Sequence, residues 1–114
     1  MNPDERHQQY IKELVANNIK TATRMARARF TLIDRTVAYE FKVYMQIWQD
    51  DDWDYNYFKS YCKKLALDAV VLNNNSYKAM SDNLYEALAA EMPGSEITIV
   101  INNGDIGLTT KYKN

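Results

Sequence analysis

Hydrophobic positions recur at intervals of three and four residues over the first quarter of the chain. This period predicts an amphipathic helix over about residues 3–28. Asn2 suits the N-cap of the helix, and Pro3 suits its first position, where a missing N–H costs nothing. The expected apolar face is formed by Ile11, Leu14, Val15, Ile19, Ala22, Met25 and Ala26.

The hydrophobic period changes to two at about residue 37, which predicts a long strand over residues 37–48. The β-branched and aromatic residues on its apolar side favour a strand. These residues are Val37, Tyr39, Phe41, Val43, Met45 and Ile47. A helix over residues 31–48 remains the alternative, because Phe30, Ile33, Val37, Phe41, Met45 and Trp48 also form a helical stripe.

Two further helices are predicted in the middle of the chain. Asp50, Asp51 and Asp52 interrupt the alternation and offer an N-cap for the second helix. Its apolar side is expected to contain Trp53, Tyr57, Tyr61, Leu65, Ala69 and Leu72. The third helix is expected to begin near Ser76, to end at Pro93-Gly94 and to align Tyr77, Met80, Leu84, Leu88 and Met92.

The C-terminal segment predicts a β-hairpin around Asn103-Gly104, a dipeptide that suits a type I′ turn with positive φ at both central residues. The expected opposite pairs are Asn102 with Asp105, Ile101 with Ile106, Ile99 with Leu108, Thr98 with Thr109, and Glu96 with Lys111. The sequence therefore predicts one α+β domain over residues 1–114. Three helices are expected to pack on a small antiparallel sheet, in the order α-β-α-α-β-β.

Composition limits the class of protein. The 114 residues are 46% hydrophobic and 25% charged with a net charge of −1, as in an ordinary globular domain. Cys62 is the single cysteine, and no apolar run reaches the length of a membrane span, so we expect a cytoplasmic protein with no membrane contact. The nine tyrosines suit half-buried surfaces. Such surfaces occur in contacts with a partner or between the subunits of a homo-oligomer, and the open alternative is a solvated edge of the core.

One segment combines carboxylates with large rings, and we predict it to be a protein-binding surface. Its residues are Asp50, Asp51, Asp52, Trp53, Asp54, Tyr55, Tyr57 and Tyr61. For the acids taken alone, the favoured interpretation is a solvated capping turn, because acids near a helix start need no further explanation. A calcium loop is not expected, because Tyr55 and Tyr61 stand where such a loop needs glycine and glutamate.

A basic group is the alternative binding site. Lys20, Arg24 and Arg27 fall on one face of the first predicted helix, where they would contact phosphates of a nucleic acid. A solvated helix face is the favoured interpretation, because Glu13 lies on the same side and cations stabilise a helix C-terminus.

Residues for catalysis are sparse. His7 and Cys62 have no partner at a catalytic spacing, and the chain contains no phosphate-binding loop, nucleophile elbow or zinc motif. We therefore expect no enzyme activity, no metal and no cofactor. The leading hypothesis is a non-catalytic interaction protein, such as a phage-type inhibitor of a nucleic-acid-processing or defence complex. The alternatives are a small nucleic-acid-binding or virion-assembly protein that uses the basic N-terminal helix, and a small-ligand binder or enzyme with an intersubunit pocket.

Overall fold

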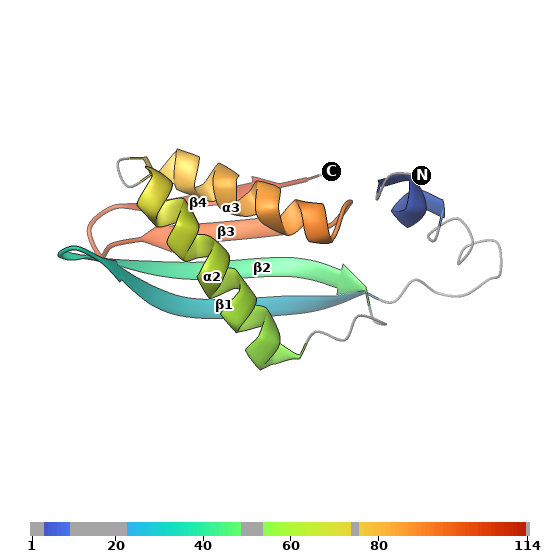
Figure 1. Ribbon diagram of the computed structural model, residues 1–114, viewed down its shortest axis with the longest axis horizontal. Coiled ribbons are helices and arrows are strands. Elements are labelled where there is room, and N and C mark those ends of the chain that lie inside the picture. Colours follow the sequence, from blue (N-terminus) through green and yellow to red (C-terminus); the bar gives the residue numbers. More distant parts are fainter. Residues whose placement is uncertain (1–3, 10–22, 49–53, 74–75, 114) are drawn as a thin grey trace.

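The computed structural model describes residues 4–9, 23–48, 54–73 and 76–113. Along the chain, one β-hairpin precedes a pair of helices and a second β-hairpin follows it (Figure 1). Residues 4–9 are also helical. The elements are β1 (Thr23–Asp34), β2 (Val37–Trp48), α2 (Tyr55–Asn73), α3 (Tyr77–Glu91), β3 (Ile97–Asn102) and β4 (Gly107–Tyr112). The predicted α+β class with a C-terminal hairpin is confirmed, whereas the predicted order lacks one strand.

The strands form one antiparallel sheet of four strands in the order β1-β2-β3-β4. Both long helices lie on the same face of this sheet, with α2 crossing β1 and α3 lying beside β3 and β4 (Figure 1). Among the described residues, no helix or strand covers the opposite face, which we call the open face. The described helices include none that is long and apolar enough to cross a membrane.

The predicted helix over residues 3–28 is wrong in its last part, because residues 23–28 begin β1; residues 10–22 lie outside the described part. Ala28, Phe30 and Leu32 are buried and alternate with exposed residues, as a half-covered strand requires. Phe30 stacks on Phe41 of β2 with 5.4 Å between ring centroids. Alanine favours helices in isolation, but pairing with β2 overrides this weak preference.

The predicted strand over residues 37–48 is confirmed as β2, and it runs through the centre of the core. Its buried side faces the helices. The largest fully buried side chains of the molecule include Phe41, Met45, Ile47, Phe58, Met80, Leu84, Leu88, Ile97, Ile99 and Ile101. The predicted apolar stripe of α3 is confirmed by the burial of Met80, Leu84, Leu88 and Met92, with Tyr77 partly buried.

The predicted apolar side of α2 is confirmed in part. Ala69 is buried, and Tyr61 and Leu65 pack against the core, whereas Tyr57 and Leu72 do not, and Trp53 lies outside the described residues. Tyr57 and Leu72 are 54% and 71% exposed, and the buried residues are Phe58, Cys62, Ala66, Ala69 and Val70. The exposed Tyr57 ring stacks on the ring of half-buried Tyr61, with centroids 6.3 Å apart.

The C-terminal hairpin pairs two residues out of the predicted register. Ile101 faces Leu108, Ile99 faces Thr110 and Ile97 faces Tyr112, while Lys111 faces Thr98 and Thr109 faces Val100. The cause is the turn. Within this turn, Gly104 alone has positive φ, at 98°, and the Asn103 side chain accepts hydrogen bonds from the N–H groups of Asp105 and Ile106. Gly104 and Asp105 are thus the central residues, and Ile106 is left 65% exposed.

Candidate nucleic-acid interface

The open face carries the side chains that alternate with the core. Each strand of the sheet contributes, because neighbouring residues of a strand point to opposite faces. Two rows of opposite residues cross all four strands, namely Arg27–Tyr44–Thr98–Lys111 and Arg29–Lys42–Val100–Thr109. We call these residues the basic rows.

The second of the basic rows begins, on β1 and β2, with two cations side by side. Arg29 and Lys42 are direct cross-strand partners, and like charges in that position are destabilising. A single carboxylate, Glu40, contacts both: Arg29 Nη2 lies 3.4 Å from Glu40 Oε2, and Lys42 Nζ lies 3.6 Å from Glu40 Oε1. The Arg29 side chain remains 69% exposed. One carboxylate therefore serves two cations and leaves a local excess of positive charge.

Arg27 and Lys111 lie at the two ends of the first row. In the described part of the chain, neither has a carboxylate within ion-pair distance. Glu96 is an acid at the border of the face, since its carbonyl accepts a hydrogen bond from the Gln46 N–H just before β3. The open face is thus basic although the chain as a whole has a net charge of −1.

A hollow of about 250 Å³ connects the basic rows to α2. It is lined by Arg27, Ala28, Arg29, Lys42, Tyr44 and Tyr55. Tyr44 is half-buried on the central strand β2, and Tyr55 is 58% exposed at the start of α2. The lining therefore combines three cationic side chains with two tyrosines, a combination also used by grooves that bind single-stranded nucleic acids.

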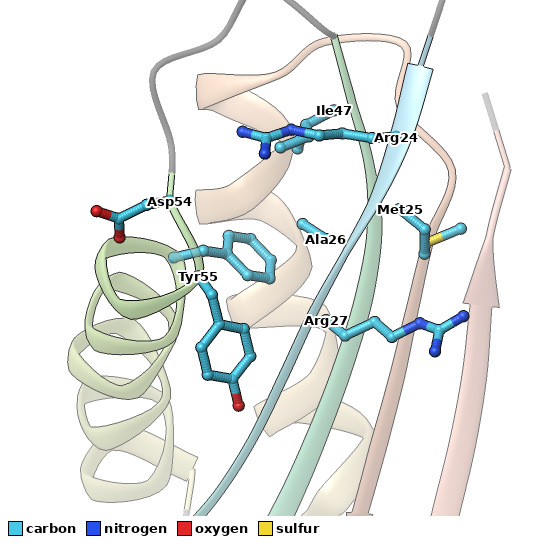
Figure 2. A pocket seen from close by; sticks show the side chains of 8 residues that line it. Arg24, Met25, Ala26, Arg27, Ile47, Asp54 and Tyr55 are labelled. Atoms are coloured by element: carbon cyan, nitrogen blue, oxygen red, sulfur yellow. The ribbon is translucent and has the colours of Figure 1, made fainter.

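A second hollow, of about 270 Å³, lies at the start of α2 (Figure 2). Arg24, Ile47 and Tyr55 are among its lining residues. Figure 2 shows Arg24 on the helix side of β1, whereas Met25 and Arg27 point to the other side. The Asp54 carboxylate caps the N-terminus of α2, because its Oδ1 accepts a hydrogen bond of 2.7 Å from the Tyr57 N–H.

The predicted protein-binding residues are only partly described. Asp50, Asp51, Asp52 and Trp53 lie outside the described residues. Asp54 takes the capping role that was predicted for the first three acids. Tyr55 and Tyr57 are 58% and 54% exposed, while Tyr61 is half-buried beside Tyr57. Burial and the neighbouring Glu91 carboxylate raise the pKa of Tyr61 to about 12.

The predicted basic group is not one surface. Lys20 lies outside the described residues, and Arg24 and Arg27 lie on opposite faces of β1 rather than on one face of a helix. The error follows from the wrong period, since positions 24 and 27 share a helix face but not a strand face. Arg29, Lys42, Lys111 and Tyr44 were missed as a group. Their alternation with core residues was visible, but the strand register that assembles them was not.

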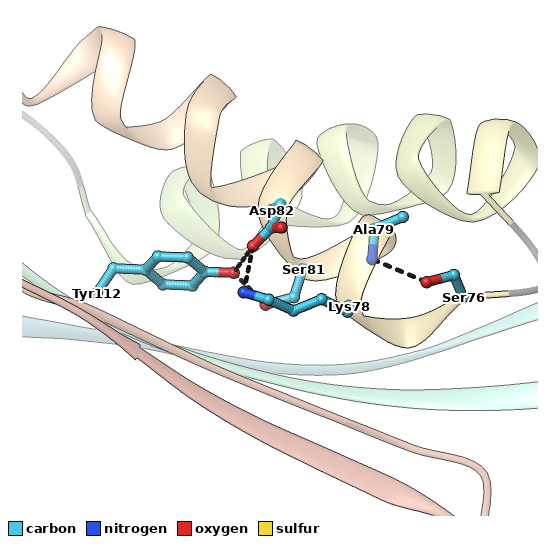
Figure 3. A network of polar contacts seen from close by, with 6 residues as sticks. All are labelled: Ser76, Lys78, Ala79, Ser81, Asp82 and Tyr112. Carbon is cyan, nitrogen blue, oxygen red and sulfur yellow. Dashed lines mark hydrogen bonds and ion pairs between the residues drawn. The ribbon is translucent and has the colours of Figure 1, made fainter.

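A polar cluster on the helix side joins β4 to α3 (Figure 3). The Tyr112 hydroxyl donates to Asp82 Oδ1 at 2.7 Å and lies 2.7 Å from the hydroxyl of buried Ser81. Lys78 Nζ contacts the same Asp82 oxygen at 2.8 Å. Burial is the main cause that raises the pKa of Tyr112 to about 12, which is the wrong direction for a proton-accepting base. We interpret the cluster as a structural clasp.

Cys62 lies in the core of the helix layer. Its side chain is fully buried near Phe58 and Ala66, and burial raises the pKa of its thiol to about 12. A protonated, enclosed thiol is a poor nucleophile. Among the described residues, no group of three or more His, Cys, Asp or Glu side chains is arranged to hold a metal ion.

Comparisons of the chain with known protein families, with curated proteins and with solved structures gave no significant match. Function is therefore inferred from the residues and their geometry.

Proposed function

We propose that this protein is a non-catalytic nucleic-acid-binding protein whose open sheet face contacts the phosphate backbone. The observation that carries the proposal is the direct pairing of Arg29 with Lys42 across β1 and β2. This pairing costs stability in the absence of an anion, and the shared Glu40 offsets it only in part. A phosphate group would relieve the repulsion and accept hydrogen bonds from the guanidinium.

The distribution of charge supports the same proposal. On the open face, Arg27, Arg29, Lys42 and Lys111 stand against Glu40 within the strands and Glu96 at the border. Complementary charge of this kind accelerates the encounter with a polyanion and makes its affinity fall with salt. A net charge of −1 for the whole chain limits binding away from this face.

The test measures the affinity of fluorescent DNA and RNA oligonucleotides between about 50 and 200 mM salt. We expect the Arg29→Gln, Lys42→Gln variant to bind more weakly. The slope of log affinity against log salt is negative. In this variant it should become shallower by about 1.4 to 1.8, because each phosphate contact contributes about 0.7 to 0.9. The matched control is Lys63→Gln, Lys64→Gln, which removes the same charge from exposed positions of α2.

A third variant is expected to change the affinity in the opposite direction. Glu40→Gln removes the carboxylate shared by Arg29 and Lys42, so we expect tighter binding than in the parent. The proposal is wrong if the parent binds neither DNA nor RNA at low salt. It is also wrong if the Arg29→Gln, Lys42→Gln variant and the α2 control bind alike.

A second candidate function is the binding of a protein partner, in the manner of the predicted inhibitor. The exposure of the Tyr55 and Tyr57 rings beside Asp54 favours it, since exposed aromatic side chains are frequent anchors of interfaces. A partner captured by the parent would dissociate faster from the Tyr55→Ala, Tyr57→Ala variant. Equal dissociation rates would remove this candidate.

A further inference from the structure

We propose that the nucleic acid bound by the open face is a single strand, and that one of its bases stacks on Tyr44. This inference rests on the function proposed above and adds to it the form of the ligand and the residue that contacts the base.

Tyr44 has the position that a stacking platform needs. It lies on β2, an inner strand of the sheet, opposite Arg27 on one side and Thr98 on the other. These neighbours keep the ring half-buried, so little conformational entropy is lost when a base covers it. Met25, which is 47% exposed, is a diagonal neighbour of Tyr44 and extends the apolar surface.

Three cations neighbour this platform, two on β1 and one on β2. Arg27 is the cross-strand partner of Tyr44, and Lys42 precedes Tyr44 by two residues on the same face. Arg29, the partner of Lys42, is the second diagonal neighbour of Tyr44. A nucleotide whose base covers Tyr44 therefore has its phosphates within reach of three cationic side chains. Stacking contributes sequence-tolerant affinity, while the cations contribute the salt-dependent part.

A duplex uses this arrangement poorly. Its bases are stacked on one another, so their faces are closed to an aromatic ring, and a flat sheet face does not enter either groove as a helix or ribbon does. The hollow between Tyr44 and Tyr55 is about 250 Å³, and its cations line the same space as the rings. An unpaired base has both faces available and fits this combination.

The first experiment uses the unaltered protein and three ligands of about 12 nucleotides, a length within the usual range for single-strand sites. The ligands are a single strand, the duplex of the same sequence, and a strand of the same length whose sugars carry no bases. We expect the ordinary strand to bind tightest. The abasic strand should bind about 5- to 150-fold more weakly for each stack that is lost, with a similar salt slope because its phosphates remain.

The second experiment replaces the platform. Tyr44→Ala should weaken single-strand binding by about 5- to 150-fold and leave the salt slope unchanged, whereas Tyr44→Phe should bind like the parent because the ring is kept. Tyr57→Ala is the control, since it removes an exposed tyrosine from α2. Circular dichroism verifies that each variant is folded.

The outcomes separate this inference from the function on which it rests. Equal binding of the ordinary and abasic strands, or a duplex bound as tightly as the single strand, overturns the stacking inference while phosphate binding stands. Parental affinity of Tyr44→Ala overturns it as well. Binding of none of the three ligands at low salt overturns both.

Discussion

Tyr112 shows how one side chain at the end of the chain fastens two layers. Its ring stacks on Tyr85 of α3 with centroids 4.0 Å apart, and Lys78 Nζ lies 5.5 Å from the ring centroid. Its hydroxyl group lies within hydrogen-bond distance of both Ser81 and Asp82. Because Ser81 is buried, loss of the hydroxyl would leave a polar group without this partner in the core.

We therefore predict that Tyr112→Phe lowers the free energy of unfolding by about 1–3 kcal/mol, although the stack on Tyr85 is kept. Urea unfolding at neutral pH measures the change. A change below about 0.5 kcal/mol, the range of ordinary surface substitutions, would show that the clasp contributes little. The matched control is Tyr57→Phe, which removes a hydroxyl group from an exposed tyrosine.

The same clasp predicts a dependence of stability on pH. The folded state raises the pKa of Tyr112 from its usual value of 10.0 to about 12. The stability that comes from the neutral phenol is then fully present below pH 10 and is lost as the pH rises toward 12. We expect the difference in unfolding free energy between the parent and Tyr112→Phe to shrink over this window. Tyr61 and Cys62 titrate equally in both proteins, so a constant difference would contradict the prediction.

The acid side of the profile follows from Asp82. Its contacts with Lys78 and Tyr112 lower the pKa of its carboxyl group below the usual 3.8. The stability contributed by the carboxylate is therefore present above the unfolded pKa and is lost as the pH falls through the folded one. Asp82→Asn, which lacks the charge, is expected to lose less stability than the parent on acidification below about pH 4. Denaturant titrations of both proteins at a series of acid pH values measure this difference, and parallel losses would contradict it.

At the scale of elements, the predictable parts were those with a strong local signal. The chain specifies α3 through the capping Ser76, whose Oγ accepts a hydrogen bond from the Ala79 N–H, and through three fully buried apolar residues, Met80, Leu84 and Leu88. The sequence of β2 alternates between core-facing apolar residues and residues of the opposite face along the strand. β1 was missed because its buried side begins with small alanines, so that its strand character depends on the partner strand.

The candidate site was predictable in residue types but not in assembly. Arginines near residues 24–29 and tyrosines near residue 55 are visible in the chain. Their convergence with Lys42 and Tyr44 depends on the register of β1 with β2, and a change of period from 3.6 to two moves Arg24 and Arg27 to opposite faces. This register is set by the two-residue turn at Arg35 and Thr36, where Arg35 has a φ of 58°. An arginine at positive φ is uncommon, so the sequence carries no clear signal for this turn.

The turn after α3 provides a prediction about an element boundary. Met92, Pro93, Gly94 and Ser95 form a turn with a hydrogen bond of 3.3 Å from the Ser95 N–H to the Met92 carbonyl, and Gly94 has φ of 86°. A Cβ atom at Gly94 would lie 3.2 Å from His7 Cδ2. We predict that Gly94→Ala lowers the free energy of unfolding by about 1–2 kcal/mol, because an L side chain is disfavoured at positive φ.

A comparison with Gly104 separates the cost of positive φ from the cost of the contact with His7. Gly104 also has positive φ, but a Cβ atom there meets nothing within 4 Å. Chemical denaturation of both alanine variants should give the larger loss for Gly94→Ala. In a double-mutant cycle, His7→Ala should remove the additional loss of unfolding free energy that Gly94→Ala shows over Gly104→Ala. Equal losses, with no coupling to His7, would show that the contact between residues 4–9 and this turn has no effect on stability.

At the scale of the whole molecule, the sheet has two outer strands, β1 and β4. β1 is 12 residues long, and an outer strand of that length exposes a row of backbone groups that can pair with another chain. It also carries Arg24, Arg27 and Arg29. Charged side chains are a common protection of such edges, and antiparallel pairing of two β1 strands would bring the arginines of two copies together.

The predicted self-association should therefore depend on salt in a direction that identifies the surface. Pairing through β1 is expected to give a mass above the 13.3 kDa of one chain, and to strengthen between about 0.1 and 1 M salt, as the Debye length falls from about 10 to 3 Å. Light scattering at several concentrations measures this. Arg27→Gln, Arg29→Gln should associate at lower salt than the parent, because the repulsion is removed, whereas the Lys63→Gln, Lys64→Gln control should not. If the parent stays monomeric while the arginine variant associates, the arginines protect the edge. If both stay monomeric, the predicted self-association is wrong. Association that weakens with salt would point to opposite charges on another surface.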